Sequence, residues 1–299
     1  MPSIFIFGLF PEDSGKTIIS SALARGLINR GIKTCVFKPR SGHDFWRQYD
    51  AYLKCKKKGR LFCEDIIKLR KACKCSLPPE VLNPVDALMS PLNAKKFIDE
   101  KMINHLYLLD ENIFSHLIVE RYTIYKNRAE NIFCINAEAT RTQSVIIDEE
   151  YLHKLESRAD EIIYVNSLEE WNNIFQRYSP KAIRSCYEKI SEKFEYIIIE
   201  GFNDAVCPDE TLRYDLTIGV APGVAIFYDA EIFQKALRML GEIRDPKTLR
   251  ARDVIKYLEK KETSLIPALP SSHLRNYDTL SRDLNRIVDL SIKVTQKDN

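Results

Sequence analysis

The chain has 299 residues, 45% of them hydrophobic and 29% charged, as is ordinary for a folded protein of one or two domains. Its 45 basic and 42 acidic residues leave a net charge of +3, which gives no support for binding to nucleic acid or to a membrane surface. No apolar run reaches the roughly 18 residues that a membrane-spanning helix needs. The N-terminal segment MPSIFIFGLF lacks a basic flank and a cleavage site, so we expect a first strand and a cytoplasmic protein.

The first 40 residues predict a strand, a loop, a helix and a second strand. Ile4 to Phe7 form a continuous apolar run, which is typical of a strand buried on both faces. Residues 17–31 place apolar side chains at helical spacing and end at Gly31, a suitable helix stop. Residues 33–39 predict the second strand. This order implies parallel strands, and we expect an α/β fold with a mostly parallel sheet flanked by helices.

The loop between the first strand and the helix resembles a phosphate-binding loop with unusual spacing. Six residues separate Gly8 from Gly15, whereas the usual pattern before Gly-Lys-Thr has four. Lys16 would reach the β- and γ-phosphates and Thr17 would offer its hydroxyl to Mg²⁺. The alternative is a strand–helix turn that contains Gly-Lys-Thr by chance, but its position after a buried strand favours nucleotide binding. We expect these residues to bind the nucleotide: Glu12, Asp13, Ser14, Gly15, Lys16, Thr17 and Ile18.

The middle of the chain is less regular. Residues 131–136, 144–147 and 161–167 look like strands, and a capping box formed by Ser167 and Glu170 predicts a helix from there. We interpret residues 1–299 as a single α/β domain with an insertion at about 95–190, and a small separate domain is the alternative.

The last hundred residues return to a clear pattern. Buried strands are predicted at 194–201 and 214–223, and a helix at 229–240. A further helix at 251–261, a short strand-like segment at 264–270 and a last helix at 278–292 complete the chain.

Two residues at predicted strand ends are candidates for a site near the loop. Glu200 closes the apolar run YIIIE, and Lys38 follows the second strand. The carboxyl ends of parallel strands share one edge of a sheet, where α/β folds bind ligands. A carboxylate there suits Mg²⁺, and two lysines would offset the charge of a transferring phosphoryl group. For Lys38, an exposed strand-end lysine is an equal alternative, and Asp204 is a weaker metal candidate.

In order along the chain, these features resemble dethiobiotin synthetase and related ATP-dependent enzymes. That family has an expanded phosphate loop, a second strand ending in Lys-Pro, and a Ser-Gly pair shortly after it. Here the pairs are Lys38-Pro39 and Ser41-Gly42. The segments LNPVDALMSPLNA, IIIEG and VAPGVAIF are similar to later segments of the family. The resemblance implies a P-loop NTPase of the dethiobiotin synthetase type.

The resemblance also implies roles for individual residues. Lys16, Lys38 and Ser41 would contact the phosphoryl group or a reacting carbamate, and Thr17, Asp50 and Glu200 would bind Mg²⁺. ATP and Mg²⁺ would be the cofactors, and the protein would be a homodimer that acts on a small molecule as an ATP-driven ligase.

This sequence departs from the family at several points. Phe227 and Tyr228 stand near the place where the family has a substrate-anchoring Asn-His pair. The alternative function is therefore a nucleotide-binding ATPase or GTPase that regulates a partner, without ligase activity.

Four of the eight cysteines lie close together in the sequence, at Cys55, Cys63, Cys73 and Cys75. Structural zinc sites usually contain Cys-x-x-Cys pairs, and this spacing has none. We interpret these residues as reduced thiols, with a metal site as the alternative.

Overall fold

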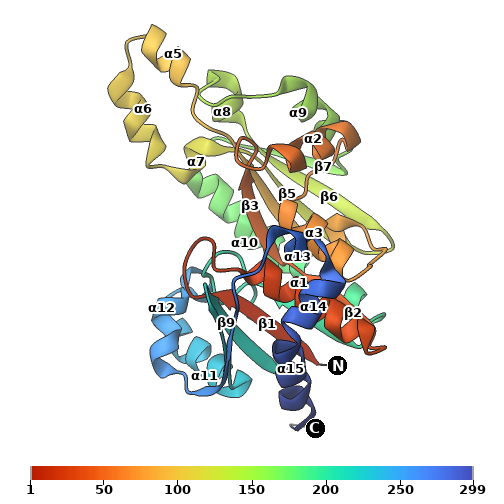
Figure 1. The fold of residues 1–299 in the computed structure, drawn as a ribbon. Coiled ribbons are helices and arrows are strands. Elements are labelled where there is room, and N and C mark those ends of the chain that lie inside the picture. The colour runs from red at the N-terminus through yellow and green to blue at the C-terminus, as the bar shows by residue number, and fades with distance from the viewer. Residues whose placement is uncertain (1, 298–299) are drawn as a thin grey trace. The chain divides into compact units, whose positions relative to one another are not determined.

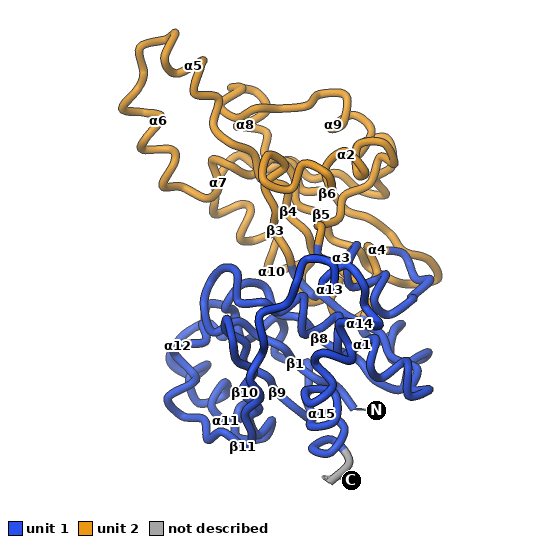
Figure 2. Tube along the Cα trace, viewed as in Figure 1, with its two compact units in different colours: residues 1–40, 65–78, 187–299 blue, residues 41–64, 79–186 orange. Residues whose placement is uncertain are grey.

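The computed structural model describes residues 2–297, which divide into two compact units (Figures 1 and 2). Unit 1 comprises residues 1–40, 65–78 and 187–299, and unit 2 comprises residues 41–64 and 79–186. Each unit contains one mixed sheet flanked by helices, so the α/β class is confirmed. Unit 2 takes in most of the expected insertion and also residues 41–64 and 79–94. That the whole chain forms a single domain stays a prediction.

The sheet of unit 1 has six strands in the order β11-β10-β9-β1-β8-β2. Four of them run parallel, with β1 between β8 and β9. The strand β10 is antiparallel to both of its neighbours, β9 and β11, so the sheet is mixed. The strands are β1 (Ser3–Gly8), β2 (Thr34–Phe37), β8 (Tyr196–Glu200), β9 (Leu216–Ala221), β10 (Val224–Tyr228) and β11 (Lys260–Leu265).

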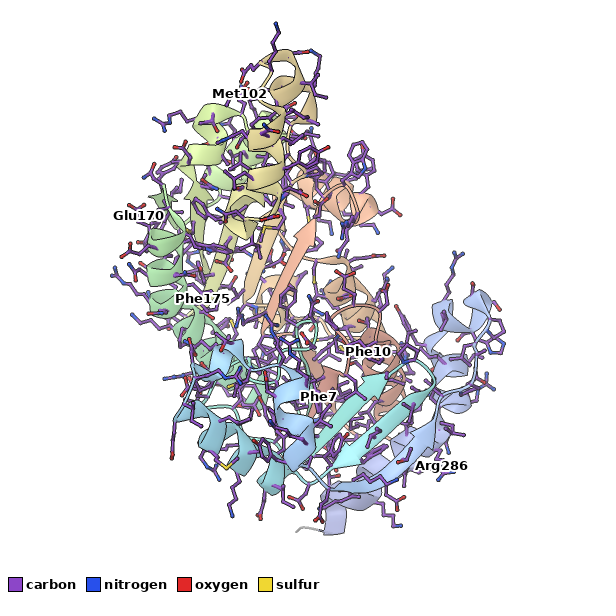
Figure 3. All side chains as sticks on the ribbon, turned by 90° about the vertical axis from the view of Figure 1, so that its left-hand side faces the viewer. Phe7, Phe10, Met102, Glu170, Phe175 and Arg286 are labelled. Atoms are coloured by element: carbon purple, nitrogen blue, oxygen red, sulfur yellow. The ribbon has the colours of Figure 1, made fainter. Side chains whose placement is uncertain are left out.

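Aromatic side chains form the core beside the central strand of unit 1. Phe5 and Phe7 are fully buried on β1 and share one face of the sheet, because alternate residues of a strand point the same way. Both pack against Phe233 of α11 (Ala230–Gly241), with ring centroids 5.9 Å and 5.3 Å away. Phe5 also stacks on Tyr214 at 4.6 Å. The packing holds β1 in place on that face (Phe7 is labelled in Figure 3).

The helix after the first glycine loop packs closely on the C-terminal helices of unit 1. The helix α1 (Lys16–Asn29) contacts α14 (Tyr277–Asp283) and α15 (Asn285–Lys297). A Cβ atom on Gly26 would lie 2.6 Å from Val288, so glycine permits the approach of α1 to α15. The remaining helical segments of unit 1 are most of α3 (Glu64–Ala72), η1 (Pro246–Thr248), α12 (Ala251–Val254), η2 (Ile255–Tyr257) and α13 (Ser271–Arg275).

The sheet of unit 2 has five strands in the order β3-β4-β5-β6-β7. The pairs β4–β5 and β5–β6 are antiparallel, whereas β6–β7 is parallel. The strands are β3 (Arg40–Asp44), β4 (Val85–Met89), β5 (Leu117–Tyr125), β6 (Ala129–Asn136) and β7 (Glu161–Val165). The helices are α2 (Tyr49–Lys58), α4 (Pro79–Leu82), α5 (Ala94–Asp99), α6 (Ile103–Asp110), α7 (Ile113–His116), α8 (Ala137–Thr142), α9 (Glu149–Glu156) and most of α10 (Leu168–Ser191).

Two predicted elements are wrong. Residues 144–147 form no strand, and only Val145 makes an isolated bridge, to Leu92. The predicted helix at 251–261 stops early, because residues from Lys260 onward pair with the otherwise open edge of β10 as β11. Two more predicted elements are altered: the strand-like segment at 264–270 shares only residues 264 and 265 with β11, and the helix at 278–292 is divided into α14 and α15. The remaining predicted strands and helices are present with shifted ends. Among the described residues, no helix combines the length and the apolar character that crossing a membrane requires.

Candidate functional site

The topology of unit 1 brings three strand ends to one edge of the sheet. Strand β1 ends at Gly8, and its register with β8 pairs Ile6 with Glu200. Strand β2 lies on the other side of β8 and pairs Phe37 with Ile199, so Lys38 follows at the same edge. Since these strands are parallel, their carboxyl ends meet there, as the sequence predicted.

Two glycines give the loop its backbone path. A Cβ atom on Gly8 would lie 2.7–2.9 Å from the Ser14 hydroxyl and from two backbone oxygens, so only glycine fits there. Gly15 has φ of 84° immediately before α1, in the left-handed region that favours glycine. The buried Ser14 hydroxyl donates to the carbonyl of Phe10 at 2.7 Å, which closes the added length of the loop on itself (Phe10 is labelled in Figure 3).

The backbone amides of the loop are free to bind an anion. Within residues 2–297, no hydrogen bond joins the amides of residues 12–17 to an acceptor. The first intrahelical bonds of α1 are donated by Ile18 and Ile19 to the Gly15 carbonyl, at 3.1 Å and 3.2 Å. Free amides and the positive end of a fourteen-residue helix favour a phosphate at this position.

Four side chains form a cluster beside the loop, namely Thr17, Lys38, Asp65 and Glu200. We call this group the carboxylate cluster. The Thr17 hydroxyl donates to Glu200 Oε1 at 3.0 Å. Lys38 Nζ donates to the same oxygen at 2.7 Å and to Asp65 Oδ2 at 2.8 Å. Lys38 is therefore no exposed strand-end lysine, because its side chain is only 4% exposed and bridges two carboxylates.

Glu200 has one carboxylate oxygen still available. The residue is fully buried, and its Oε2 atom has no hydrogen-bond partner among the described residues. A buried anionic oxygen without a donor is costly unless a cation completes its surroundings. Together with the Thr17 hydroxyl and the Asp65 carboxylate, it makes an oxygen donor set of the kind that Mg²⁺ prefers. The residues present thus fit Mg²⁺.

Lys16 lies within the electrostatic influence of the same cluster. Burial lowers the pKa of Lys16 below its usual value, and the nearby Lys38 ammonium lowers it further. The carboxylates of Glu200, Asp65 and Asp204 offset this effect only in part. An additional anion beside Lys16, such as a phosphate, would restore its ammonium form.

The carboxylate of Asp65 is held in its ionised form. Its burial raises the pKa, but the ammonium groups of Lys38 and Lys68 together outweigh that effect, so the pKa of Asp65 lies below its usual value. The hydrogen bond with Thr17 acts in the same direction. Asp65 is therefore available as an anionic ligand at neutral pH.

Two of the predicted site residues belong to unit 2. Ser41 is buried there and its hydroxyl donates to Asp86 at 2.5 Å and to Asn83 at 3.0 Å. Asp50 is exposed in the first turn of α2. Their roles beside the nucleotide stay predictions, and nothing in their surroundings inside unit 2 supports them.

Sequence reasoning missed Asp65. Asp65 follows Glu64 at the start of α3, in the segment CEDIIKLRK. Acidic residues are common in the first turn of a helix, so the sequence gives no sign that this one belongs to a site. The weaker candidate Asp204 is 9% exposed and lies 3.4 Å from Arg250, which already compensates its charge.

The four cysteines that lie close together in the sequence do not form one group in the structure. Cys73 and Cys75 associate with Cys35 of β2, whose sulfur is 3.9 Å from that of Cys75. Cys55 donates instead to the Phe62 carbonyl at 3.2 Å, within unit 2. Residues 2–297 contain no group of three or more His, Cys, Asp or Glu side chains placed to hold a metal. The cysteines form no disulfide among the described residues, and their interpretation as reduced thiols stays a prediction.

No protein-family model matches this chain, and no curated protein has a matching sequence.

Proposed function

We propose that unit 1 binds ATP with Mg²⁺ and transfers the γ-phosphoryl group, either to a small-molecule acceptor or to water. One observation carries the proposal. Thr17 and Lys38 donate to one oxygen of the buried Glu200, beside a glycine-bounded loop whose amides at residues 12–17 have no acceptor among the described residues. A structural ion pair explains neither the free amides nor the second oxygen of Glu200, which has no partner among the described residues.

The nucleotide phosphates would bind at the N-terminus of α1. The amides of residues 12–17 supply the hydrogen bonds, and the helix dipole favours negative charge there. Lys16 follows Gly15 directly and adds a positive charge on the first turn of the helix. The added length of the loop does not oppose this role, because Ser14 folds the loop back onto the Phe10 carbonyl.

Mg²⁺ would be held by the Thr17 hydroxyl and the carboxylates of Glu200 and Asp65. Asp65 replaces Asp50 in this proposal, because Asp65 already shares Lys38 with Glu200. Bound Mg²⁺ supplies neutralising charge to the phosphate oxygens. The protein would hold the oxygen atoms of Thr17, Asp65 and Glu200 in fixed positions around the metal. It would also exclude water from around Glu200, which is fully buried.

Lys38 has two partners that the metal would also use. If Glu200 and Asp65 held a cation, they would bind the Lys38 ammonium less strongly, and it would then be able to contact the transferring phosphoryl group. A lysine that is positioned in this way stabilises charge as it builds up in the transition state. The proposed reaction type is that of dethiobiotin synthetase, in which a carbamate or carboxylate accepts the phosphoryl group. A homodimer and a cytoplasmic location stay predictions.

A regulatory ATPase is the second candidate. Phe227 and Tyr228 are buried at the end of β10 and offer no exposed polar group to anchor a substrate. In unit 2, by contrast, α6 has no buried residue, and Tyr107 and Leu108 are each 66% exposed. Exposed apolar side chains on a helix of this kind suit a partner protein.

Calorimetry with Mg·ATP and Mg·GTP tests nucleotide binding directly. We expect micromolar binding to the wild type and no detectable binding to Lys16→Ala. Lys33→Ala is the matched control, since Lys33 is exposed at the amino end of β2, away from the loop. If both lysine variants bind equally well, the loop does not hold the phosphates and the proposal is wrong.

Phosphate release then separates the two candidate functions. For the ligase, we expect ADP formation that rises when a diamine and bicarbonate are added together. For the regulatory ATPase, we expect a slow basal rate that these compounds leave unchanged. The absence of any hydrolysis that depends on Lys16 contradicts both.

A further inference from the structure

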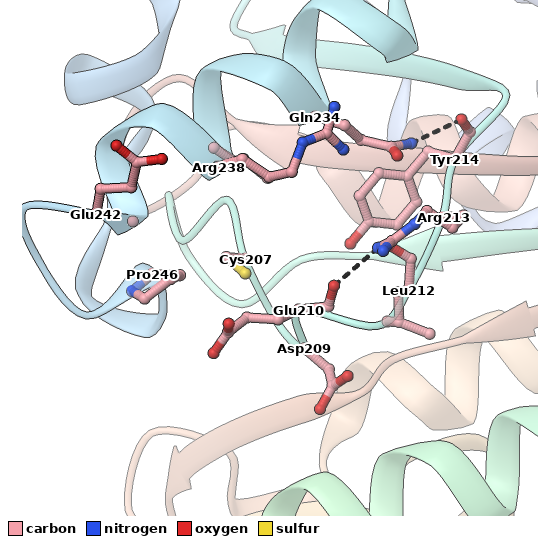
Figure 4. Close-up of a pocket in the computed structure, with 12 residues that line it drawn as sticks. Cys207, Asp209, Glu210, Leu212, Arg213, Tyr214, Gln234, Arg238, Glu242 and Pro246 are labelled. Carbon is pink, nitrogen blue, oxygen red and sulfur yellow. Dashed lines mark hydrogen bonds between the residues drawn. The ribbon is translucent and has the colours of Figure 1, made fainter.

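A cavity of unit 1 lies away from the glycine loop that precedes α1. It has a volume of about 370 Å³ and is formed by the segment before β9 and by one face of α11 (Figure 4). Ser3, at the amino end of β1, donates to the carbonyl of Arg213 in its wall. The cavity therefore borders the amino-terminal edge of the sheet, whereas the phosphate loop follows the carboxyl end of β1. The six residues of β1 separate the two edges by roughly 20 Å.

One buried polar group of this cavity has no partner. The Tyr214 hydroxyl makes no hydrogen bond with any described residue, although the side chain is only 6% exposed. In Figure 4 this hydroxyl points toward the side of the cavity that holds Cys207. Burial raises the pKa of Tyr214, so the hydroxyl stays protonated and can donate to an acceptor. A buried hydroxyl without a partner is uncommon, and a ligand acceptor would satisfy it.

The rim of the cavity carries both signs of charge. Arg238 and Glu242 are exposed, and their side chains make no ion pair or hydrogen bond with the residues in 2–297. Arg213 and Glu210 also line the cavity, and Arg213 donates to the Glu210 carbonyl at 2.8 Å. Since the buried Asp209 also lines the cavity, the lining has two cations and three anions, which offer a place for a carboxylate and a separate place for an ammonium group.

The interior of the cavity is mainly apolar. Leu212 and Leu237 are buried in its wall, and Pro246 closes one end. Burial raises the pKa of the Cys207 thiol to about 12, so this thiol is neutral and is not a nucleophile at ordinary pH. The volume lies at the small end of the range for sites that bind small molecules.

We propose that this cavity is a second ligand site, which binds a small zwitterion with an apolar body, such as an L-α-amino acid with an apolar side chain. The carboxylate accepts from the Tyr214 hydroxyl and faces Arg238, the ammonium group faces the rim carboxylates, and the apolar side chain lies against the two leucines. The site is separate from the nucleotide site and does not depend on the proposed phosphoryl transfer.

Ligand-observed NMR and calorimetry with L-leucine, L-methionine and L-phenylalanine test the proposal. We expect at least one of them to bind with a Kd below about 1 mM. Two analogues of leucine then test the zwitterion, namely leucinamide, which lacks the carboxylate, and 4-methylpentanoate, which lacks the ammonium group. Each analogue should bind at least about ten-fold more weakly, and equal binding overturns the proposed chemistry.

Variants of the cavity locate the binding. Tyr214→Phe and Arg238→Gln should each weaken binding about ten-fold, because each removes one polar contact to the carboxylate. Lys235→Gln is the matched control, since Lys235 is exposed on the same helix but does not line the cavity. Failure of all three amino acids to bind, or the same Kd in all three variants, overturns the proposal.

Discussion

The ion pair between Lys38 and Glu200 should contribute strongly to the stability of unit 1. Lys38→Met removes the ammonium but keeps a flexible chain of similar length. The two charges are 2.7 Å apart and the side chains are 4% and 1% exposed, so solvent screens them little. Their attraction is about 6 kcal/mol at an effective dielectric constant of about 20, and desolvation offsets part of it. The variant leaves Glu200 buried beside Thr17 without a cation, which costs about 3–5 kcal/mol of unfolding free energy.

A second substitution should reverse most of that loss. In Lys38→Met/Glu200→Gln neither charge remains, so we expect the double variant to be at least about 2 kcal/mol more stable than Lys38→Met. Lys33→Met, at the exposed amino end of the same strand, should change stability by less than about 0.5 kcal/mol. Urea unfolding followed by far-UV circular dichroism reports on both units. Fluorescence reports on unit 2, because both tryptophans, Trp46 and Trp171, belong to it.

Magnesium ions connect this experiment with the proposed function. If Glu200 is a metal ligand, Mg²⁺ should stabilise Lys38→Met more than the wild type, in which the ammonium competes for the same oxygen. The double variant should gain nothing from Mg²⁺. A loss of less than about 1 kcal/mol in Lys38→Met shows that the ion pair does not hold this region together. Equal stabilisation of the single and double variants by Mg²⁺ shows that the metal binds elsewhere.

Three further predictions address single residues. Asp65→Asn should weaken Mg²⁺-dependent nucleotide binding at least about ten-fold in calorimetry, whereas Asp50→Asn should leave it unchanged. The opposite result would make Asp50 the metal ligand instead of Asp65. A bound phosphate raises the lowered pKa of Lys16, so nucleotide binding should take up protons once the pH exceeds the pKa of the free protein, and the affinity should fall as the pH rises further. Calorimetry in buffers of different ionisation enthalpy measures this proton uptake. If no proton is taken up at alkaline pH, Lys16 does not lie beside the phosphates. Tyr214→Phe removes a buried hydroxyl without a partner, so it should stabilise the ligand-free protein by about 1 kcal/mol in scanning calorimetry, and a loss of that size indicates a hydrogen bond that the structure does not contain.

The predictable part of the site lies where local sequence determines the backbone. The strand, glycine loop and helix around Gly8, Gly15 and Lys16 follow from apolar runs and glycine positions, and the structure contains them. Glu200 and Lys38 were found because each directly follows or closes a buried strand, and parallel strands meet at one edge. These inferences need only the order of elements along the chain.

The rest of the site depends on packing between segments that are distant in sequence. Asp65 reaches Lys38 because α3 is placed beside β2, and no local pattern encodes that placement. The antiparallel pairing of unit 2 was also missed, since β3 and β4 carry polar residues such as His43 and Asp86 that are buried together. Buried polar pairs of this kind hide the alternating pattern from which strands are predicted.

The pairing of β1 constrains the order in which the protein can fold during translation. Ser3 pairs with Ile197 and Ile4 with Leu216, so the first strand of the chain finds its neighbours only after all of unit 2 has been synthesised. During translation, β1 and the loop after it therefore remain unpaired. Unit 2 can fold earlier, because its paired strands are closer to one another in sequence than β1 is to β8 and β9. A chain that is truncated before residue 196 and released from the ribosome should thus contain a folded unit 2 and an N-terminal segment that is still open to proteases.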